Sequence, residues 1–223
     1  QNPTGTTTGQ SKREAIAALA ARWGMTIVED IPYRRLRYYG THVPPYRELA
    51  PERVVQLSSF SKLLAPGLRV GWALAQPEAV ATMSKLAEDT YITPAMLAQG
   101  AVYEFLRAGY LEDNLERLKV LYRPRLEAMV GALERHLPEA RWIHPEGGFF
   151  VGLTLPEGVD ASAVADIARE KHGLVLSESA GFFADGDPSR FVRLPFCALG
   201  EEEIDEAVAR LARAVDEAKQ RRR

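Results

Sequence analysis

The sequence predicts an α/β fold in which helices alternate with the strands of a mostly parallel sheet, followed by a small α+β domain. Two observations support this prediction. In the first half, helical patterns are followed by short runs of β-forming apolar residues, which is typical of strands buried on both faces. Beyond residue 136 the expected order becomes β-β-α-β-β-α, which is typical of an α+β domain. We expect the domains to cover residues 1–112 and 113–223.

The first half is expected to hold three helices and three strands. The first helix covers residues 11–22, where Ser11 and Glu14 have the spacing of a capping box and Gly24 ends the apolar pattern. Two further helices have a proline at or near the first turn. These helices are expected at residues 77–89 and 94–108, and the strands at 25–28, 53–58 and 70–75.

The second half is expected to begin with a long amphipathic helix over residues 111–136 that bridges the two domains. Pro124 should kink or break this helix, because proline removes a backbone donor and clashes with the preceding turn. The later strands are expected near residues 141–143, 149–155, 174–176 and 191–196, and the later helices at about 160–172 and 200–219.

The composition is that of a globular protein and excludes several classes of partner. Of 223 residues, 46% are hydrophobic and 26% charged, which is sufficient for a core. With 28 basic and 30 acidic residues the net charge is -2, so we expect no nucleic-acid partner and no anionic membrane partner. No apolar run approaches the roughly 20 residues that a membrane span needs. The single cysteine, Cys197, suits a reducing compartment, so we expect a cytoplasmic location.

The segment Ser58-Ser59-Phe60-Ser61-Lys62 follows an expected strand. Hydroxyls beside a lysine at the carboxyl end of a strand suit an anion or phosphate site. Arg69, which Gly67 and Gly71 flank, is a candidate second phosphate ligand through its guanidinium group. The alternatives are a solvated surface lysine and a salt bridge of Arg69 at the strand edge.

Asp30 ends another apolar strand, and Tyr33 follows three residues later. Because the carboxyl ends of parallel strands meet at one edge of a sheet, we expect Asp30 and Lys62 to share a rim. A turn or cap role for Asp30 and simple packing for Tyr33 are the alternatives. Together, a reactive lysine, an acid for a ring nitrogen, and hydroxyls with an arginine for a phosphate match the needs of pyridoxal phosphate. The four histidines have no metal-ligand spacing, so we expect no metal site.

At these motifs the sequence resembles the fold-type-I pyridoxal-phosphate aminotransferases of class I/II, over essentially the whole chain. It is most similar to the subgroup of 2-aminoadipate, kynurenine and aromatic or branched-chain aminotransferases. The matching motifs are Asn2–Gly5, Glu29–Tyr33, Ser59–Lys62, Ala65–Trp72 and Val192–Leu194. The resemblance implies that residues 1–112 are the C-terminal part of the large cofactor-binding domain, and that residues 113–223 are the bridging helix and the small domain.

The resemblance also implies a role for individual residues. Lys62 would be the catalytic residue, which carries pyridoxal 5′-phosphate and moves the proton of the substrate α-carbon. Asp30 would pair with the ring nitrogen of the cofactor. The other implied contacts are Tyr33 and Asn2 with the cofactor 3-oxygen, Ser59, Ser61 and Arg69 with the phosphate, and Asn2 and Arg193 with the substrate α-carboxylate. Without the resemblance, Arg193 would be interpreted as a charge on the surface of a strand.

The implied function is transamination between an α-amino acid and a 2-oxo acid, with 2-oxoglutarate as the expected acceptor, ping-pong kinetics and a homodimeric enzyme. Two alternatives share the motifs: a pyridoxal-phosphate-dependent β-lyase, and the aminotransferase-like effector domain of a transcription regulator. The chain opens on Gln1 and not on a methionine, and it has roughly half the usual length of the family. We therefore expect a C-terminal portion of a longer protein, whose upstream part completes the cofactor site.

Overall fold

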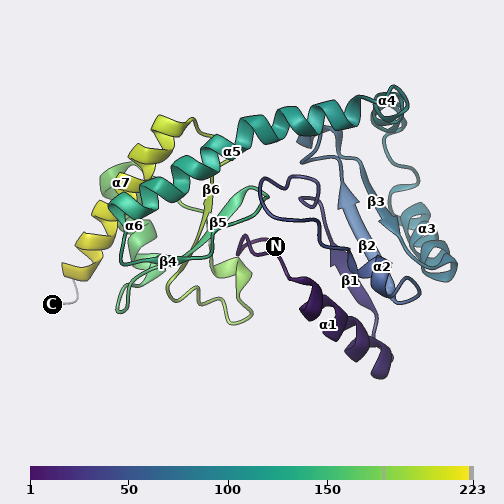
Figure 1. Ribbon diagram of the computed structural model, residues 1–223, viewed down its shortest axis with the longest axis horizontal. Helices are drawn as coiled ribbons and strands as arrows, with labels where there is room; N and C mark the ends of the chain where they lie inside the picture. Colours follow the sequence, from purple (N-terminus) through teal and green to yellow (C-terminus); the bar gives the residue numbers. More distant parts are fainter. Residues whose placement is uncertain (178, 221–223) are drawn as a thin grey trace. The chain divides into compact units, whose positions relative to one another are not determined.

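The computed structural model of the chain describes residues 1–177 and 179–220 (Figure 1). These residues form two compact units. One unit covers Thr8–Leu118, and the other joins Gln1–Thr7 to the described residues from Lys119 onward. The first seven residues therefore pack with the C-terminal unit, although the expected domain of residues 1–112 included them. The division into functional domains stays a prediction.

The N-terminal unit contains a three-stranded sheet of order β1-β2-β3. Strands β1 (Ile27–Asp30) and β2 (Val54–Ser59) are parallel, whereas β3 (Gly71–Leu74) is antiparallel to β2. The connection between β2 and β3, which includes the 3-10 helix η1 (Pro66–Leu68), is too short for the crossover that a parallel neighbour requires. The mixed α/β class that the sequence predicts is thus confirmed, with a mixed sheet.

A small apolar cluster connects this sheet to helices α1 (Gln10–Arg22) and α2 (Tyr46–Leu49). Its buried members are Ala17, Ala50 and Val54, and Ile27, Tyr46 and Leu49 pack against them. The opposite strand, β3, is exposed along its whole length, and Val28 of β1 is 65% exposed. The expected burial of this sheet on both faces is therefore wrong for the described chain, because the cluster that involves α1 and α2 lies on one side of it.

The start of α1 differs from the expected capping box. The helix begins at Gln10, its N-cap is Gly9, and no side chain caps it. Ser11 lies inside the first turn, and the Gln10 amide instead donates to the Glu14 carboxylate over 2.6 Å. The capping-box prediction is wrong because the N-cap is Gly9, two residues before Ser11, which puts Ser11 past the cap position.

Three helices follow the first sheet: α3 (Pro77–Tyr91), α4 (Met96–Arg107) and α5 (Tyr110–His136). The boundary between the two compact units falls within α5. This helix continues through Pro124 and is not broken there, contrary to one of the expected outcomes. Proline removes the backbone donor for the carbonyl of Val120, and the 75% exposure of Val120 lets water replace that donor.

The C-terminal unit packs two helices beside a second three-stranded sheet of order β4-β5-β6. Both strand pairs of this sheet are antiparallel. Its elements are β4 (Arg141–Trp142), β5 (Phe150–Thr154), α6 (Ala161–His172), η2 (Ala180–Phe182), β6 (Phe191–Pro195) and α7 (Glu201–Gln220). Val192 and Leu194 are buried and Arg193 between them is half-buried, as the alternation in this strand predicts.

The strand expected at residues 174–176 does not form. Helix α6 ends on Gly173, whose positive φ of 60° lets the chain reverse. The Leu174 N–H then donates to the carbonyl of Ala168 and so closes the last turn of the helix. Val175 is 80% exposed, and because the helix end uses the N–H of Leu174, that donor is not available for pairing with a strand.

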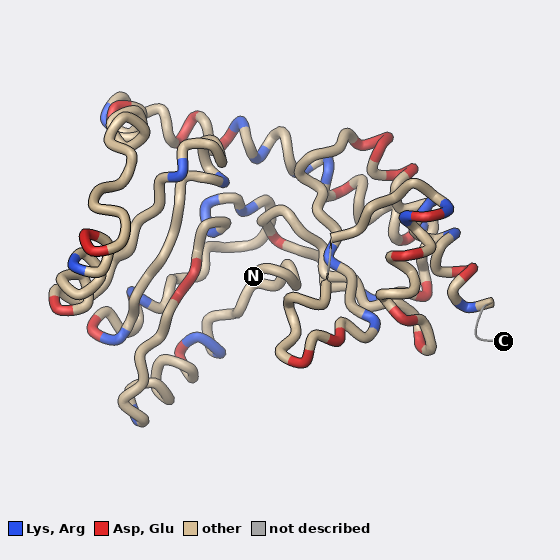
Figure 2. Tube along the Cα trace, turned by 180° about the vertical axis from the view of Figure 1, so that it is seen from behind, with Lys and Arg blue, Asp and Glu red and all other residues tan. Residues whose placement is uncertain are grey.

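Charged residues of both signs are distributed over both units, as Figure 2 shows along the Cα trace. Helix α7, for example, begins with three glutamates and carries Lys219 in its last turn, which suits the helix dipole. Among the described residues, none of the helices combines the length and the hydropathy needed to cross a bilayer.

Glu217 connects α7 to the end of α6, and its titration should affect stability. Its carboxylate pairs with the Lys171 ammonium and lies 2.9 Å from Nε2 of His172. The hydrogen bond from Lys171, and then the one from His172, lower the pKa of Glu217 below its ordinary value. A carboxyl group whose pKa is lowered in the folded state stabilises the fold at pH values above its ordinary pKa. This stabilisation is lost as the pH falls through the lowered pKa.

We therefore expect Glu217→Gln to lower the melting temperature at neutral pH, and the difference from wild type to vanish at acidic pH. Scanning calorimetry between about pH 3 and 8, a range that brackets the ordinary carboxyl pKa, measures this difference in melting temperature. Glu202→Gln on the same helix is the control, because the structure shows no partner for Glu202 among the described residues. A Glu217→Gln effect that persisted undiminished in acid would show that this linkage is absent.

Candidate active site

The turn that follows β2 places Lys62 near Tyr33. The Phe60 N–H donates to the carbonyl of Val70, the residue before β3, over 3.0 Å, and the Leu64 N–H donates to the Phe60 carbonyl over 2.8 Å. The Lys62 Nζ atom lies 5.9 Å from the centre of the Tyr33 ring. Both side chains are half-buried. The structure therefore brings these two expected site residues together.

Asp30 is the last residue of β1, and its side chain is exposed. It lies opposite Leu57 in the parallel register, and the Ile31 N–H extends the pairing by donating to the Leu57 carbonyl over 2.9 Å. Since β1 and β2 are parallel, Asp30 and the Lys62 turn follow the same edge of the sheet. The predicted shared rim of Asp30 and Lys62 depends on this parallel register, and the rim itself stays a prediction.

A buried charge network lies next to Asp30, and the sequence analysis did not find it. The Glu29 side chain is only 5% exposed. Its carboxylate accepts hydrogen bonds from Arg13 of α1 over 2.9 Å, from the Gln56 side chain of β2 over 3.0 Å, and from the Tyr46 N–H over 3.0 Å. The Arg13 guanidinium carbon also lies 4.9 Å from the centre of the Tyr46 ring. An acidic residue inside an apolar strand was the available signal, because a buried carboxylate needs partners.

The candidate phosphate ligands lie around the β2–β3 connection. Arg69 adopts left-handed backbone angles, with φ 51° and ψ 35°, at the end of η1. Its Nη1 atom lies 3.5 Å from the Ser61 hydroxyl and 3.4 Å from the Pro66 carbonyl, both long contacts. Ser59 pairs with Gly71 in the β2–β3 register. No acidic side chain among the described residues pairs with Arg69, so the alternative of a strand-edge salt bridge is not what the structure shows.

Asn2 and Arg193 form a second group of expected site residues in the C-terminal unit. The Arg193 Nη1 atom donates to the Asn2 Oδ1 atom over 3.0 Å. Arg193 lies opposite Gly152 in the β5–β6 register. A side chain at position 152 would lie 2.8 Å from the carbonyl of Thr4, so glycine is what allows the first residues to pass close to β5.

The expected residues thus form two groups, one in each compact unit. The N-terminal unit carries Asp30, Tyr33, Ser59, Ser61, Lys62 and Arg69. The C-terminal unit carries Asn2 and Arg193. The roles expected for the two groups, a cofactor-binding rim in one and a carboxylate-binding pair in the other, stay predictions.

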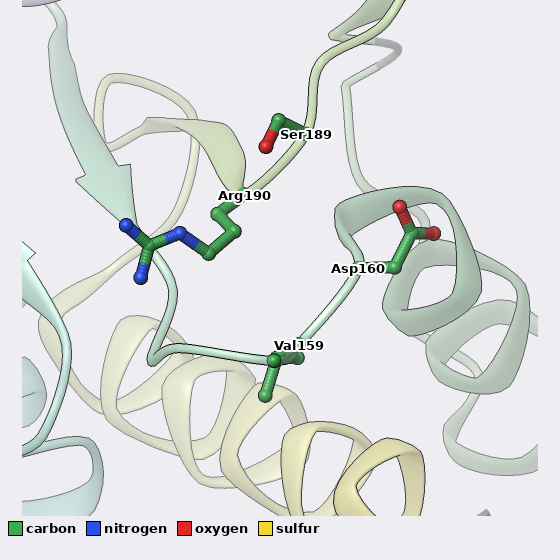
Figure 3. Close-up of a pocket in the computed structure, with 5 residues that line it drawn as sticks. Val159, Asp160, Ser189 and Arg190 are labelled. Atoms are coloured by element: carbon green, nitrogen blue, oxygen red, sulfur yellow. The ribbon is translucent and has the colours of Figure 1, made fainter. Parts of the chain in front are cut away.

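Figure 3 shows a surface pocket of the C-terminal unit that none of these expected site residues lines. Its lining is Gly158, Val159, Asp160, Ser189 and Arg190. Asp160 already caps α6 by accepting the Ala163 N–H over 2.8 Å, and Arg190 donates to the carbonyl of Leu155 over 3.3 Å. Its charged groups therefore serve the fold. Among the described residues, no cluster of three or more His, Cys, Asp or Glu side chains is placed to hold a metal ion.

Comparison with protein families finds one model that matches residues 1–211, described as "Aminotransferase class I and II". The chain is 36% identical over 219 residues to aromatic-amino-acid aminotransferase 1 of Thermococcus litoralis, which covers 97% of this chain and 52% of that protein. It is 38% identical over 220 residues to the 2-aminoadipate transaminase of Thermus thermophilus, covering 96% and 55%. The chain therefore spans about half the length of these relatives.

Solved structures show the same similarity. The multiple substrate aminotransferase of Thermococcus profundus superposes with a TM-score of 0.95 at 36% identity, over 99% of this chain and 55% of that one. The α-aminoadipate aminotransferase of Thermus thermophilus, complexed with N-(5′-phosphopyridoxyl)-L-leucine, has a TM-score of 0.92 at 36% identity, over 99% and 57%. A kynurenine aminotransferase of Pyrococcus horikoshii, in complex with PMP, has a TM-score of 0.94 at 35% identity, over 97% and 54%.

Some relatives belong to another functional class. An HTH-type transcriptional regulator of Bacillus subtilis is 30% identical over 217 residues, which are 95% of this chain and 44% of that protein. The similarity to both classes agrees with the set of alternatives that the motifs leave open, and it does not favour the regulator.

The Glu29 network generates a prediction about stability. Removing Arg13 would leave a buried carboxylate without its cation, so we expect Arg13→Met to destabilise the protein by about 2–4 kcal/mol. Urea unfolding at pH 7 measures this loss. Lys12→Met is the matched control on the same helix, because Lys12 is exposed. A loss no larger than that of the control would mean that the pair contributes nothing to the fold.

Proposed function

The chain belongs to the class I and II aminotransferase family, and on this premise we propose that the full-length protein transfers an amino group from an α-amino acid to a 2-oxo acid. The proposed cofactor is pyridoxal 5′-phosphate, derivatives of which are present in two of the similar structures. The finer parts of the proposal are 2-oxoglutarate as acceptor, ping-pong kinetics and the individual residue roles.

The observation that carries this proposal is the position of Lys62. Its amine lies at the carboxyl edge of a parallel strand pair, faces the ring of Tyr33, and has no carboxylate partner among the described residues. An amine that no carboxylate holds in an ion pair can react with an aldehyde cofactor, as the proposal requires. The contact with the Tyr33 ring supports this role over the alternative from the sequence, a solvated surface lysine.

The residues around Lys62 fit the proposed cofactor in chemistry. Arg69 is an uncompensated cation with its Nη1 atom near the Ser61 hydroxyl, which suits a phosphate. Asp30 supplies an anion for a protonated ring nitrogen, and Tyr33 supplies a hydroxyl for the 3-oxygen. When bound, pyridoxal phosphate supplies an electron sink that stabilises negative charge at the substrate α-carbon.

Lys62 and Arg193 would then have separate tasks. As a general base, the Lys62 Nζ atom would take the proton from the substrate α-carbon, and as a general acid it would deliver that proton to the cofactor carbon that receives the amino group. The Arg193 guanidinium, together with Asn2, binds the α-carboxylate, which is common to all the amino acid and 2-oxo acid substrates. Because the same groups serve both half reactions, the amino acid donor leaves as its 2-oxo acid before the 2-oxo acid acceptor enters. This is the ping-pong order.

A homodimer and a cytoplasmic location are further parts of the proposal. Exposed apolar side chains gather around the α3–α4 connection and suit a surface that a second copy covers, with the turn at residues 91–94 near the partner's site. The largest of them are Tyr91, Ile92, Met96 and Leu97, with exposed fractions between 60% and 90%. The single cysteine, Cys197, supports the reducing compartment.

The role of Lys62 is tested by trapping the cofactor. Full-length protein is loaded with pyridoxal 5′-phosphate, reduced with borohydride and digested, and mass spectrometry should find the pyridoxyl group on Lys62. Lys62→Ala should carry no label and lose at least about 10³-fold in transamination. Lys85→Ala, in an exposed lysine of α3, is the control and should leave both results unchanged. Labelling and turnover that survived in Lys62→Ala would refute the assignment.

Asp30 generates a separate prediction. Asp30→Asn keeps the shape of the side chain and removes its charge, so we expect kcat to fall by about 10²–10³-fold while the cofactor still binds. Asp113→Asn, in an acidic residue of the first turn of α5, is the charge-matched control. Steady-state kinetics and a cofactor-binding titration decide the matter. If Asp30→Asn kept a kcat near that of the wild type, Asp30 would be a turn residue without a role in catalysis.

Assays of amino-acid turnover by the full-length protein separate the alternative functions. Release of pyruvate and ammonia from cystathionine, without transfer to 2-oxoglutarate, would identify a β-lyase. Cofactor binding without turnover of any amino acid, in a full-length protein that carries a DNA-binding segment, would identify a regulator.

A further inference from the structure

Two phenyl rings contact the guanidinium group of Arg193. The guanidinium carbon lies 4.5 Å from the centre of the Phe150 ring and 4.7 Å from the centre of the Phe182 ring. Both distances are within the roughly 6 Å over which a cation is attracted to an aromatic face. Phe150 belongs to β5, which lies beside β6 in the sheet (Figure 1), whereas Phe182 belongs to η2 in the connection that precedes β6.

The Arg193 guanidinium has a third contact besides these two rings, a hydrogen bond to Asn2. Gly152, the register partner of Arg193, leaves space beside β5 for the backbone of Thr4. That close approach brings Asn2 to the arginine, whose Nη1 donates to Asn2 Oδ1 over 3.0 Å. The guanidinium is therefore held by groups from β5, η2 and the first residues of the chain.

The held cation keeps most of its hydrogen-bond capacity. A guanidinium carries five N–H donors, and Asn2 takes one of them. No acidic side chain among the described residues pairs with Arg193, and its Nε atom is buried without an acceptor there. The aromatic rings attract the charge but do not replace an anion. Orientation without neutralisation is the state that a binding site for a planar carboxylate requires.

We propose that Phe182 is a positioning residue that holds the plane of the Arg193 guanidinium for the α-carboxylate of the substrate. This inference rests on the proposed carboxylate-binding role of Arg193. Arginine has many rotamers, and a ring against its planar face removes those that turn the donors away. Phe182 acts through Arg193 and touches no reacting atom in this proposal.

This role predicts where the loss of Phe182 appears. Because every α-amino acid carries the same carboxylate, Phe182→Ala should weaken the binding of unlike amino acids by a similar factor. We expect about 3- to 10-fold, the range that corresponds to one partly desolvated cation–π contact. The maximal rate should change much less, since the proton transfer by Lys62 does not involve this ring.

The test uses the full-length protein loaded with pyridoxal 5′-phosphate and two probes, α-methyl-L-leucine and α-methyl-L-glutamate. Both carry the amino and carboxylate groups but have no α-proton to transfer, so binding is measured without turnover. Titration calorimetry gives Kd for wild type, Phe182→Ala, Phe182→Leu and Phe182→Tyr. We expect Ala and Leu to weaken both probes by similar factors, and Tyr, which keeps the aromatic face, to restore wild-type binding.

Phe183→Ala is the matched control. Phe183 is the next residue, it is 36% exposed against 37% for Phe182, and its ring contacts Phe191 at 5.8 Å between centres. We expect this variant to bind both probes as the wild type does. Melting temperatures of all variants show whether each remains folded. If Phe182→Ala does not fold, the Phe182→Leu and Phe182→Tyr variants still test the proposal.

A double-mutant cycle with Arg193→Lys identifies the route of the effect. If Phe182 acts through the guanidinium, Phe182→Ala should cause little further loss in the Arg193→Lys background. A full additional loss there would overturn the proposal, as would a loss confined to one of the two probes or binding unchanged in Phe182→Ala.

Failure of this inference can be distinguished from failure of the proposed function. Transamination with unchanged probe binding in Phe182→Ala would refute the positioning role and leave the aminotransferase proposal intact. Probe binding that depends on Phe182 and Arg193, in a protein that transfers no amino group, would do the reverse. A wild-type protein that binds neither probe would overturn the positioning role, whatever its activity.

Discussion

The parallel pairing of β1 with β2 is the constraint on which the candidate cofactor site depends. Its register sets Glu29 opposite Gln56 and Asp30 opposite Leu57, so that the two strands end at the same edge. The side chains of Glu29 and Asp30 alternate across the sheet, and only that of Glu29 is buried. A shift of one residue would exchange them, burying Asp30 and exposing the carboxylate that Arg13, Gln56 and Tyr46 now satisfy.

The distribution of charge partners separates side chains that serve the fold from side chains that we propose bind ligands. Glu29 is buried and has three donors, so its charge is balanced within the fold. Lys62, Arg69 and Arg193 carry positive charge without an acidic partner among the described residues. Two of these cations are instead close to aromatic rings, which orient a charge but leave its donors unused. Such uncompensated cations suit the binding of the anionic cofactor and the carboxylate substrate that we propose.

The C-terminal unit reaches its site residues in a different way. Here the site depends on the first residues of the chain, which pack beside β5 because Gly152 has no side chain. The bond between Asn2 and Arg193 spans 191 positions of the sequence, and no local pattern refers to it. The compact units therefore do not follow the order of the chain, since residues 1–7 and the described residues from 119 onward form one unit.

The sequence by itself determined the elements and the strand-end residues of this protein. Apolar runs followed by Asp30 or by the Ser59–Lys62 segment are local patterns, and local patterns decide where a strand ends and which side chains follow it. The alternation of Val192, Arg193 and Leu194 likewise showed which side chain leaves the core.

Only the tertiary structure decided the partners. The antiparallel direction of β3, the buried network around Glu29 and the contact of Phe182 with Arg193 join residues whose spacing carries no period. The segment 174–176 had the composition of a strand, but the end of α6 uses the N–H of Leu174. The physical reason is the same in each case. Hydrogen-bond and packing partners are selected by proximity after folding, and a local pattern states which residues need a partner without stating which partner they obtain.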